Sequence, residues 1–191
     1  MLSFTYLLLS ASHIAIGVML WRVKGPQDAY KTAAMCLWLG AYACIANAPI
    51  FSPVIEPEMA VLGINLCLYV GFPMMALVLL DLALCWQWQR ATWGRIFLAL
   101  AAMFELMRRA ESGNNYGEFI LIACALAFLV AFFRIIKSAK ALGQTIKKPS
   151  IVLSFYFGLM MASLWSFNTT FALLWNSLTL LTLGGYLYFA A

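Results

Sequence analysis

The chain has few charged residues, and this shortage excludes an ordinary soluble protein. Charged residues make up 10% of its 191 residues, whereas a soluble domain carries about 25%. Hydrophobic residues make up 65% of the chain, and its mean hydropathy is +0.91. A fold in water could not bury this much apolar surface, so we expect an all-α membrane protein whose main solvent is lipid.

Histidine is nearly absent as well, and the single imidazole of His13 excludes several kinds of site. Haem held by paired histidines, histidine-rich di-iron centres and three-histidine zinc sites need more imidazoles than the chain has. No Gly-x-Ser-x-Gly turn presents a nucleophilic serine, and no glycine-rich loop is placed to cradle phosphate. We therefore expect no enzyme activity, cofactor or metal, although a dyad of His13 with a serine stays open as a third hypothesis.

Paired cysteines are also missing. The five cysteines lie inside predicted helices without a Cys-x-x-Cys pair, which argues against a redox relay or a clustered metal site. Cys36, Gly40 and Cys44 instead repeat every four residues. Small residues at this spacing let membrane helices approach closely, so this pattern indicates helix packing.

Long apolar runs are the dominant feature of the sequence. A membrane span needs about 20 apolar residues, and the chain offers seven candidates. Pro73 interrupts the third candidate and predicts a kink, because it frees the carbonyl of Tyr69 from its helical bond. The candidates are Leu2–Trp21, Ala33–Phe51, Met59–Trp86, Thr92–Met107, Phe119–Ile136, Ile151–Phe167 and Phe171–Ala191.

The distribution of positive charge predicts the orientation of such a bundle. With seven spans, ten of the twelve lysines and arginines fall in loops on one side, and only Arg108 and Arg109 fall on the other. The positive-inside rule then places the N-terminus outside and the C-terminus inside. The net charge of +5 thus indicates contact with anionic lipid and not with nucleic acid. We expect residues 1–191 to form one transmembrane domain without a soluble domain, in the inner membrane of a bacterium.

Polar residues within the predicted spans are the candidate functional residues, because such groups cost free energy in lipid unless they are satisfied. On the first span Ser10, His13 and Gly17 fall on one helical face, which should turn His13 toward other helices. His13 is expected to be first a packed hydrogen-bond donor and second a contact for a solute. Asp81 is expected to pair with Arg90 or Arg95.

Two smaller motifs at the ends of predicted helices indicate structural roles. Trp21, Trp86, Trp88 and Trp93 are expected to anchor the inner interface, where amphipathic rings sit well. On the outer side Glu105, Arg108 and Arg109 fall within one helical turn and can pair locally.

The first three and last three predicted spans can be aligned as a possible three-one-three internal repeat. Asn65 and Asn176 then enter the third helix of each half. Together with Pro26–Gln27 in the first inner loop, this pattern resembles that of the PQ-loop sugar facilitators. The resemblance implies a solute site near the axis between the halves, formed by Asn65, Trp165 and Asn176. The second half departs from the pattern, since no proline precedes Gln144, so family membership is not assigned.

Two functional hypotheses follow from the sequence. In the first, the protein binds or passes a small, mostly neutral solute at a central polar site formed by His13, Asn65, Trp165 and Asn176. In the second, it is a non-catalytic subunit or a sensor module of a larger membrane assembly, with a membrane protein or further copies of itself as partner. The second rests on the short loops and the small-residue packing faces.

Overall fold

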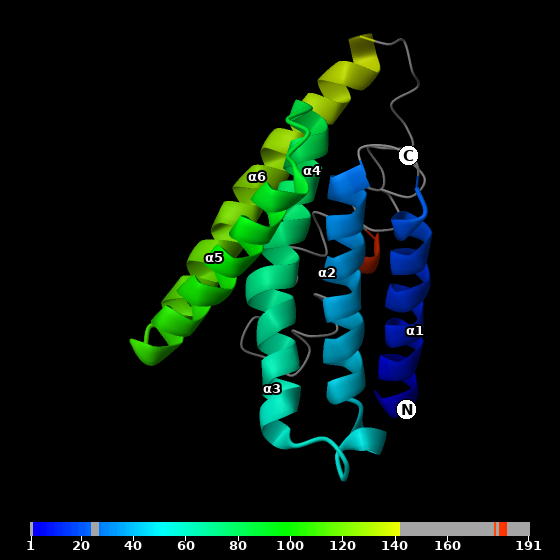
Figure 1. The fold of residues 1–191 in the computed structure, drawn as a ribbon, viewed down its shortest axis with the longest axis vertical. Helices are drawn as coiled ribbons and strands as arrows, with labels where there is room; N and C mark the ends of the chain where they lie inside the picture. Colours follow the sequence, from blue (N-terminus) through cyan, green and yellow to red (C-terminus); the bar gives the residue numbers. More distant parts are fainter. Residues whose placement is uncertain (1, 24–26, 142–177, 179, 183–191) are drawn as a thin grey trace.

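The protein is described by a computed structural model that covers residues 2–23, 27–141, 178 and 180–182. In this part of the chain every regular element is a helix, and there are no strands. Consecutive long helices run in alternating directions (Figure 1). The elements are α1 (Leu2–Trp21), α2 (Gln27–Ala46), the 3-10 turn η1 (Pro49–Phe51), α3 (Pro57–Leu66), the π-helical turn η2 (Cys67–Gly71), α4 (Phe72–Leu84), α5 (Arg90–Arg109) and α6 (Gly113–Ala141).

Helices lie at the positions of five of the seven predicted spans, although α2 begins before Ala33 and ends before Phe51. The bounds of α1 are those predicted, and α3, η2 and α4 form one rod where the third span was expected. Of the described helices, two are long and apolar enough to cross a membrane, Ser3–Trp21 and Pro57–Leu84. The sixth and seventh predicted spans fall almost wholly outside the described residues. The seven-helix bundle is therefore not confirmed, and its orientation and internal repeat stay predictions.

The predicted distortion at Pro73 takes the form of a π-helical turn. Proline has no N–H to donate, and the turn immediately before it, η2, widens. The N–H of Phe72 donates to the carbonyl of Cys67, five residues earlier. Such single π turns are local insertions into an α-helix. All five residues of η2 are buried, so the wide turn lies within the core of the protein.

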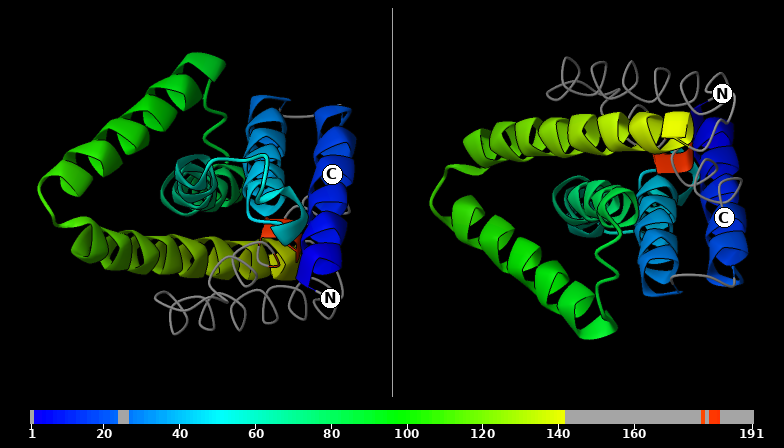
Figure 2. Two further views of the ribbon diagram at one scale, coloured as in Figure 1. Left: turned by 90° about the horizontal axis from the view of Figure 1, so that it is seen from below. Right: turned by 90° about the horizontal axis from the view of Figure 1, so that it is seen from above.

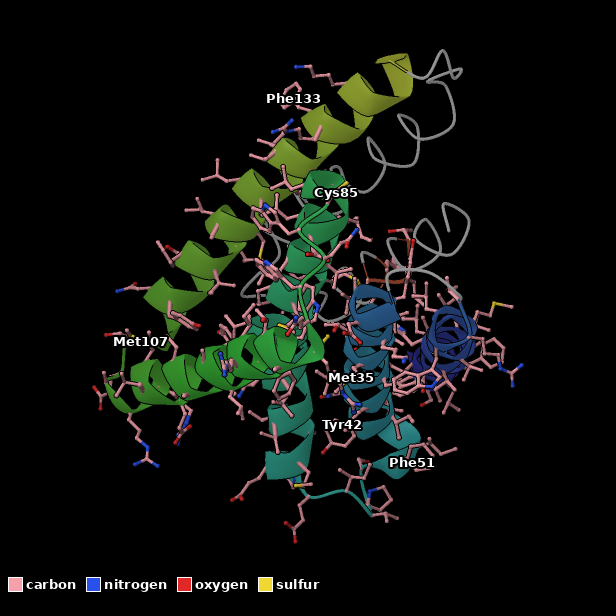
Figure 3. All side chains as sticks on the ribbon, turned by 45° about the horizontal axis from the view of Figure 1, so that its top comes forward. Met35, Tyr42, Phe51, Cys85, Met107 and Phe133 are labelled. Carbon is pink, nitrogen blue, oxygen red and sulfur yellow. The ribbon has the colours of Figure 1, made fainter. Side chains whose placement is uncertain are left out.

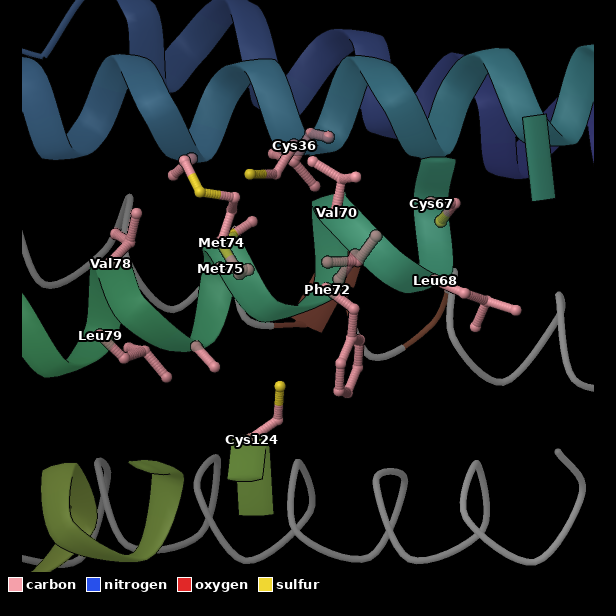
Figure 4. Close-up of a cluster of buried hydrophobic side chains, with 14 of the residues drawn as sticks. Cys36, Cys67, Leu68, Val70, Phe72, Met74, Met75, Val78, Leu79 and Cys124 are labelled. Carbon is pink, nitrogen blue, oxygen red and sulfur yellow. The ribbon is translucent and has the colours of Figure 1, made fainter. Parts of the chain in front are cut away.

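The rod formed by η2 and α4 is the centre of the hydrophobic core. Figure 4 shows Val70 and Met74 facing α2, where Cys36 lies, and Phe72 facing α6, from which Cys124 points back. These five side chains are all at most 4% exposed. Because α4 is apolar on both of these faces, it can pack between two helices at once, as a helix at the centre of a bundle must.

The last two helices diverge from the rest. A short turn after Arg109 joins α5 to α6, and the two helices open from it as the arms of a V with the α3–α4 rod between them (Figure 2). Glu111 in this turn has a φ of 56°, and the N–H of Ser112 donates to the carbonyl of Met107 at 3.0 Å. These features end α5 with a left-handed cap of the Schellman type, a position at which glycine is usual.

The outward side of α6 is apolar. Along α6 the exposed large side chains recur every three or four residues, which makes one continuous stripe on the helix surface. Figure 3 labels Phe133 on α6, where its side chain is 66% exposed. We call this set the α6 stripe; it consists of Phe119, Ile122, Leu126, Val130 and Phe133.

Asp81 does not form the ion pair expected from the sequence. Its carboxylate Oδ1 accepts a hydrogen bond from the backbone N–H of Trp88 at 3.1 Å, and its carbonyl accepts one from the N–H of Trp86 at 3.1 Å. No ion pair joins it to Arg90 or Arg95 within the described part of the chain. The prediction of that pair is wrong because the loop after α4 folds back over Asp81, which is only 2% exposed, and supplies backbone donors.

Candidate functional site

His13 lies in the interface between α1 and α2 and is fully buried. Its Nδ1 lies 2.7 Å from the carbonyl oxygen of Leu9, one turn earlier in α1. A carbonyl only accepts, so this bond assigns the proton to Nδ1. The polar face of α1 therefore turns inward, with Ser10 buried beside it, while Phe4 and Leu8 on the other side are exposed. The predicted orientation of His13 is confirmed.

Two glycines make room for this close contact of α1 and α2. A Cβ on Gly40 of α2 would lie 2.8 Å from both Cδ2 and Nε2 of His13. A Cβ on Gly17 of α1 would lie 2.5 Å from Nε1 of Trp38. Each helix thus places a large ring over a glycine of the other, the kind of contact by which small residues bring membrane helices together. His13 acts here as a packing residue.

The other predicted solute-binding residues are not gathered around His13 in the described part of the chain. Asn65 is half-buried in the last turn of α3, and α2 lies between α1 and α3 in Figure 1. Trp165 and Asn176 lie outside the described residues. The central polar site thus stays a prediction, and a different region presents the features of a binding site.

A cavity of about 360 Å³ lies among α2, α4 and α5, beside the end of α1. This volume falls within the range of small-molecule sites, about 300–1,000 Å³. Its wall is mainly apolar, as in such sites. The apolar and small lining residues are Trp21, Met35, Cys36, Leu39, Met74, Trp93, Gly94, Phe97 and Leu98, and the polar ones are Asp28, Thr32, Lys31 and Arg90.

The polar lining residues lie where two helices begin. Asp28 and Lys31 are in the first turns of α2, and Arg90 is the first residue of α5. Oδ2 of Asp28 accepts a hydrogen bond from the backbone N–H of Arg90 at 3.0 Å. The hydroxyl of Thr32 donates to the carbonyl of Asp28 at 2.7 Å. A carboxylate at a helix N-terminus is stabilising, so Asp28 fixes the start of α5 against α2 and shapes this end of the cavity.

Aromatic rings close the same end. The ammonium of Lys31 lies 5.8 Å from the ring centroid of Trp21, a distance at which a cation is attracted to an aromatic face. Trp93 is only 3% exposed, and its indole nitrogen has no hydrogen-bond partner within the described part of the chain. A buried donor of this kind costs free energy.

The sequence does not indicate that these lining residues form a site. Its pattern predicts that Lys31 and Arg90 orient the protein and that Trp93 anchors the interface. One signal was available: Asp28 is the only acidic residue in the short loop segments of the predicted inner side. An isolated carboxylate among basic residues indicates a specific contact, which the structure shows to be the start of α5.

On the predicted outer side the local charge cluster is confirmed. Glu105 bonds to Nε of Arg108 and of Arg109, both at 2.8 Å. All three side chains are well exposed, so they form a solvated helix end. Among the described residues no three histidine, cysteine, aspartate or glutamate side chains gather as a metal site would require.

Comparison of the chain with protein-family models, with curated proteins and with solved structures found no match.

Proposed function

We propose that this chain is a multi-pass membrane protein that binds a small, mostly apolar solute in the cavity among α2, α4 and α5. The observation that carries the proposal is the cavity itself, with its apolar wall and a few polar groups at one end. Small-molecule binding sites typically combine an apolar wall with a few polar groups. A more specific hypothesis is that the protein also passes the solute across the membrane, as a facilitator does. That hypothesis depends on the predicted central site, which includes Asn65 and Asn176.

Two observations support the membrane location. Two described helices have the length and apolarity to cross a bilayer, and the α6 stripe leaves large apolar side chains exposed along the helix. Contiguous exposed apolar surface marks a site of contact with lipid or with another protein. We place the charged end of the cavity on the cytoplasmic side of a bacterial inner membrane, because lysine and arginine are enriched there.

A direct test uses the protein in nanodiscs of neutral phosphatidylcholine and the neutral probe 3-bromoundecan-1-ol, which carries its bromine near the head group. Bromine quenches tryptophan fluorescence at short range, and Trp21 and Trp93 both line the cavity. We expect a saturable quenching component on top of the linear component caused by partition into lipid. Nanodiscs that contain a single-span peptide with one interfacial tryptophan, in place of the protein, give the linear component alone.

Gly94→Leu is the variant that tests binding in this cavity, and Ala102→Leu is its matched control. A Cβ at Gly94 would meet no atom within 4 Å, so a leucine there fits the helix and projects beside the cavity. We expect the saturable component to fall at least fivefold. Ala102→Leu, at an exposed position of α5 that does not line the cavity, should leave it unchanged. Equal quenching in Gly94→Leu and the unchanged protein would refute binding in this cavity.

The second candidate, a subunit or sensor module, is favoured by one observation. The α6 stripe is an exposed apolar surface on α6, and this helix packs on α4 with its other side. A partner helix could cover this stripe in place of lipid. Purification from its native membrane in a mild detergent discriminates the two, since a partner of fixed stoichiometry that is lost on Leu126→Lys would favour the subunit.

A further inference from the structure

The polar end of the cavity carries an excess of positive charge. Lys31 and Arg90 contribute two positive charges and Asp28 contributes one negative charge, so one positive charge remains. Within the described part of the chain no carboxylate lies at ion-pair distance from Lys31 or Arg90. The contact of Asp28 is with the backbone of Arg90 and not with its guanidinium. Both cationic side chains thus remain able to contact an anion.

The remaining wall is suited to a hydrocarbon chain. Met74 and Cys36 form its buried floor at 2% exposure each, while Met35 and Leu98, at 49% and 67%, form its rim. An apolar floor with an exposed apolar rim makes a groove that is open to the side. The volume of about 360 Å³ is near the lower limit for small-molecule sites, which favours one chain over the two of a phospholipid.

We infer that the solute of this cavity is a single-chain amphiphile with an anionic head. The head contacts Lys31 and Arg90, and the chain lies along Met35, Met74 and Leu98. This inference rests on the proposed binding function and adds the charge of the ligand to it. Lysine and arginine bind anionic groups well, and the ring of Trp21 beside Lys31 supports the boundary between head and chain.

The experiment compares three brominated probes of equal chain length in the neutral nanodiscs. They are 3-bromoundecane-1-sulfonate, 3-bromoundecan-1-ol and (3-bromoundecyl)trimethylammonium, which are anionic, neutral and cationic. The saturable quenching of tryptophan gives the dissociation constant of each probe. We expect the sulfonate to bind about five- to tenfold more tightly than the alcohol, and the ammonium probe to bind more weakly than the alcohol.

Charge variants then assign the preference to residues. Lys31→Gln and Arg90→Gln should each weaken binding of the sulfonate by about two- to fivefold and leave binding of the alcohol unchanged. Arg90→Gln retains the backbone N–H that bonds to Asp28. Asp28→Asn retains an acceptor oxygen but removes a negative charge, so it should strengthen sulfonate binding. Arg95→Gln is the matched control, because Arg95 is an exposed arginine of α5 outside the cavity.

The outcomes separate this inference from the proposed function. If the alcohol shows saturable quenching and the sulfonate binds no more tightly, the cavity binds solutes but the anionic preference is wrong. If Arg95→Gln weakens sulfonate binding as much as Arg90→Gln does, the preference comes from the charge of the whole protein and the inference is also wrong. If no probe shows saturable quenching, the proposed binding function itself fails.

Discussion

Gly40→Ala is expected to destabilise the protein although alanine is the better helix former. The added Cβ would lie 2.8 Å from Cδ2 and Nε2 of His13, closer than carbon and nitrogen atoms pack. The imidazole cannot easily retreat, because it is fully buried and its Nδ1 is bonded to Leu9 at 2.7 Å. Either this bond or the spacing of α1 and α2 must change.

The size of the effect follows from two opposing terms. Overpacking a well-packed interior costs about 1–3 kcal/mol, and alanine is favoured over glycine inside a helix by about 0.5–1 kcal/mol. We therefore expect a net loss of about 1–2 kcal/mol in the free energy of unfolding. At Gly17 the same substitution would meet the ring of Trp38 at 2.5 Å. Trp38 is 36% exposed and can turn aside, so Gly17→Ala should cost less.

Reversible unfolding in mixed micelles, followed by circular dichroism as the fraction of denaturing detergent rises, measures these changes. Gly94→Ala is the control, since a Cβ there meets nothing within 4 Å; it should gain about 0.5–1 kcal/mol. In a His13→Ala background Gly40→Ala should no longer destabilise the protein, because the imidazole that the added Cβ would contact is absent. This coupling should amount to about 0.5–3 kcal/mol. The reasoning is refuted if Gly40→Ala behaves like Gly94→Ala in the unchanged protein, or if His13→Ala does not rescue it.

Three further substitutions test the ends of the helices by the same unfolding measurement. Asp81→Ala leaves the half-buried N–H of Trp88 without its acceptor at 3.1 Å and should cost about 1–2 kcal/mol. Asp81→Asn should cost clearly less, and equal losses would contradict this role. Glu111 has a φ of 56°, which glycine adopts without the cost that a Cβ brings. Glu111→Gly should therefore stabilise the folded protein by about 1 kcal/mol, and Glu111→Ala should not. Asn47→Ala removes a 3.0 Å bond to the carbonyl of Ala60 in α3 and should cost about 1 kcal/mol; unchanged hydrogen exchange in the first turns of α3 would count against it.

The sequence predicted the helical rods well because their signals are local. The apolar run of α1 has the same bounds in sequence and structure. The effect of Pro73 follows from its missing N–H, although the sequence did not indicate that the distortion would be a π turn. The inward face of α1 was also predictable, because its polar and small residues recur with the helical period.

The sequence could not predict which residues contact one another across helices. Asp81 was assigned an arginine partner because opposite charges were near in the sequence, yet the loop after α4 supplied the backbone of Trp88. Asp28 reaches the start of α5 across 62 positions of the chain, a contact that no local pattern contains. For the same reason the predicted site around His13 and Asn65 was drawn from the polarity of single residues and not from a shared space.

The sequence by itself determined that this protein is helical, is suited to an apolar solvent, and turns His13 toward other helices. These properties depend on composition and on periodicity along one helix, and both can be read without knowing any neighbour. Only the tertiary structure decided that His13 fills the space over Gly40, and that Lys31, Met74 and Leu98 line one cavity. A cavity is the space that several helices fail to fill, so it exists only once their mutual positions are fixed.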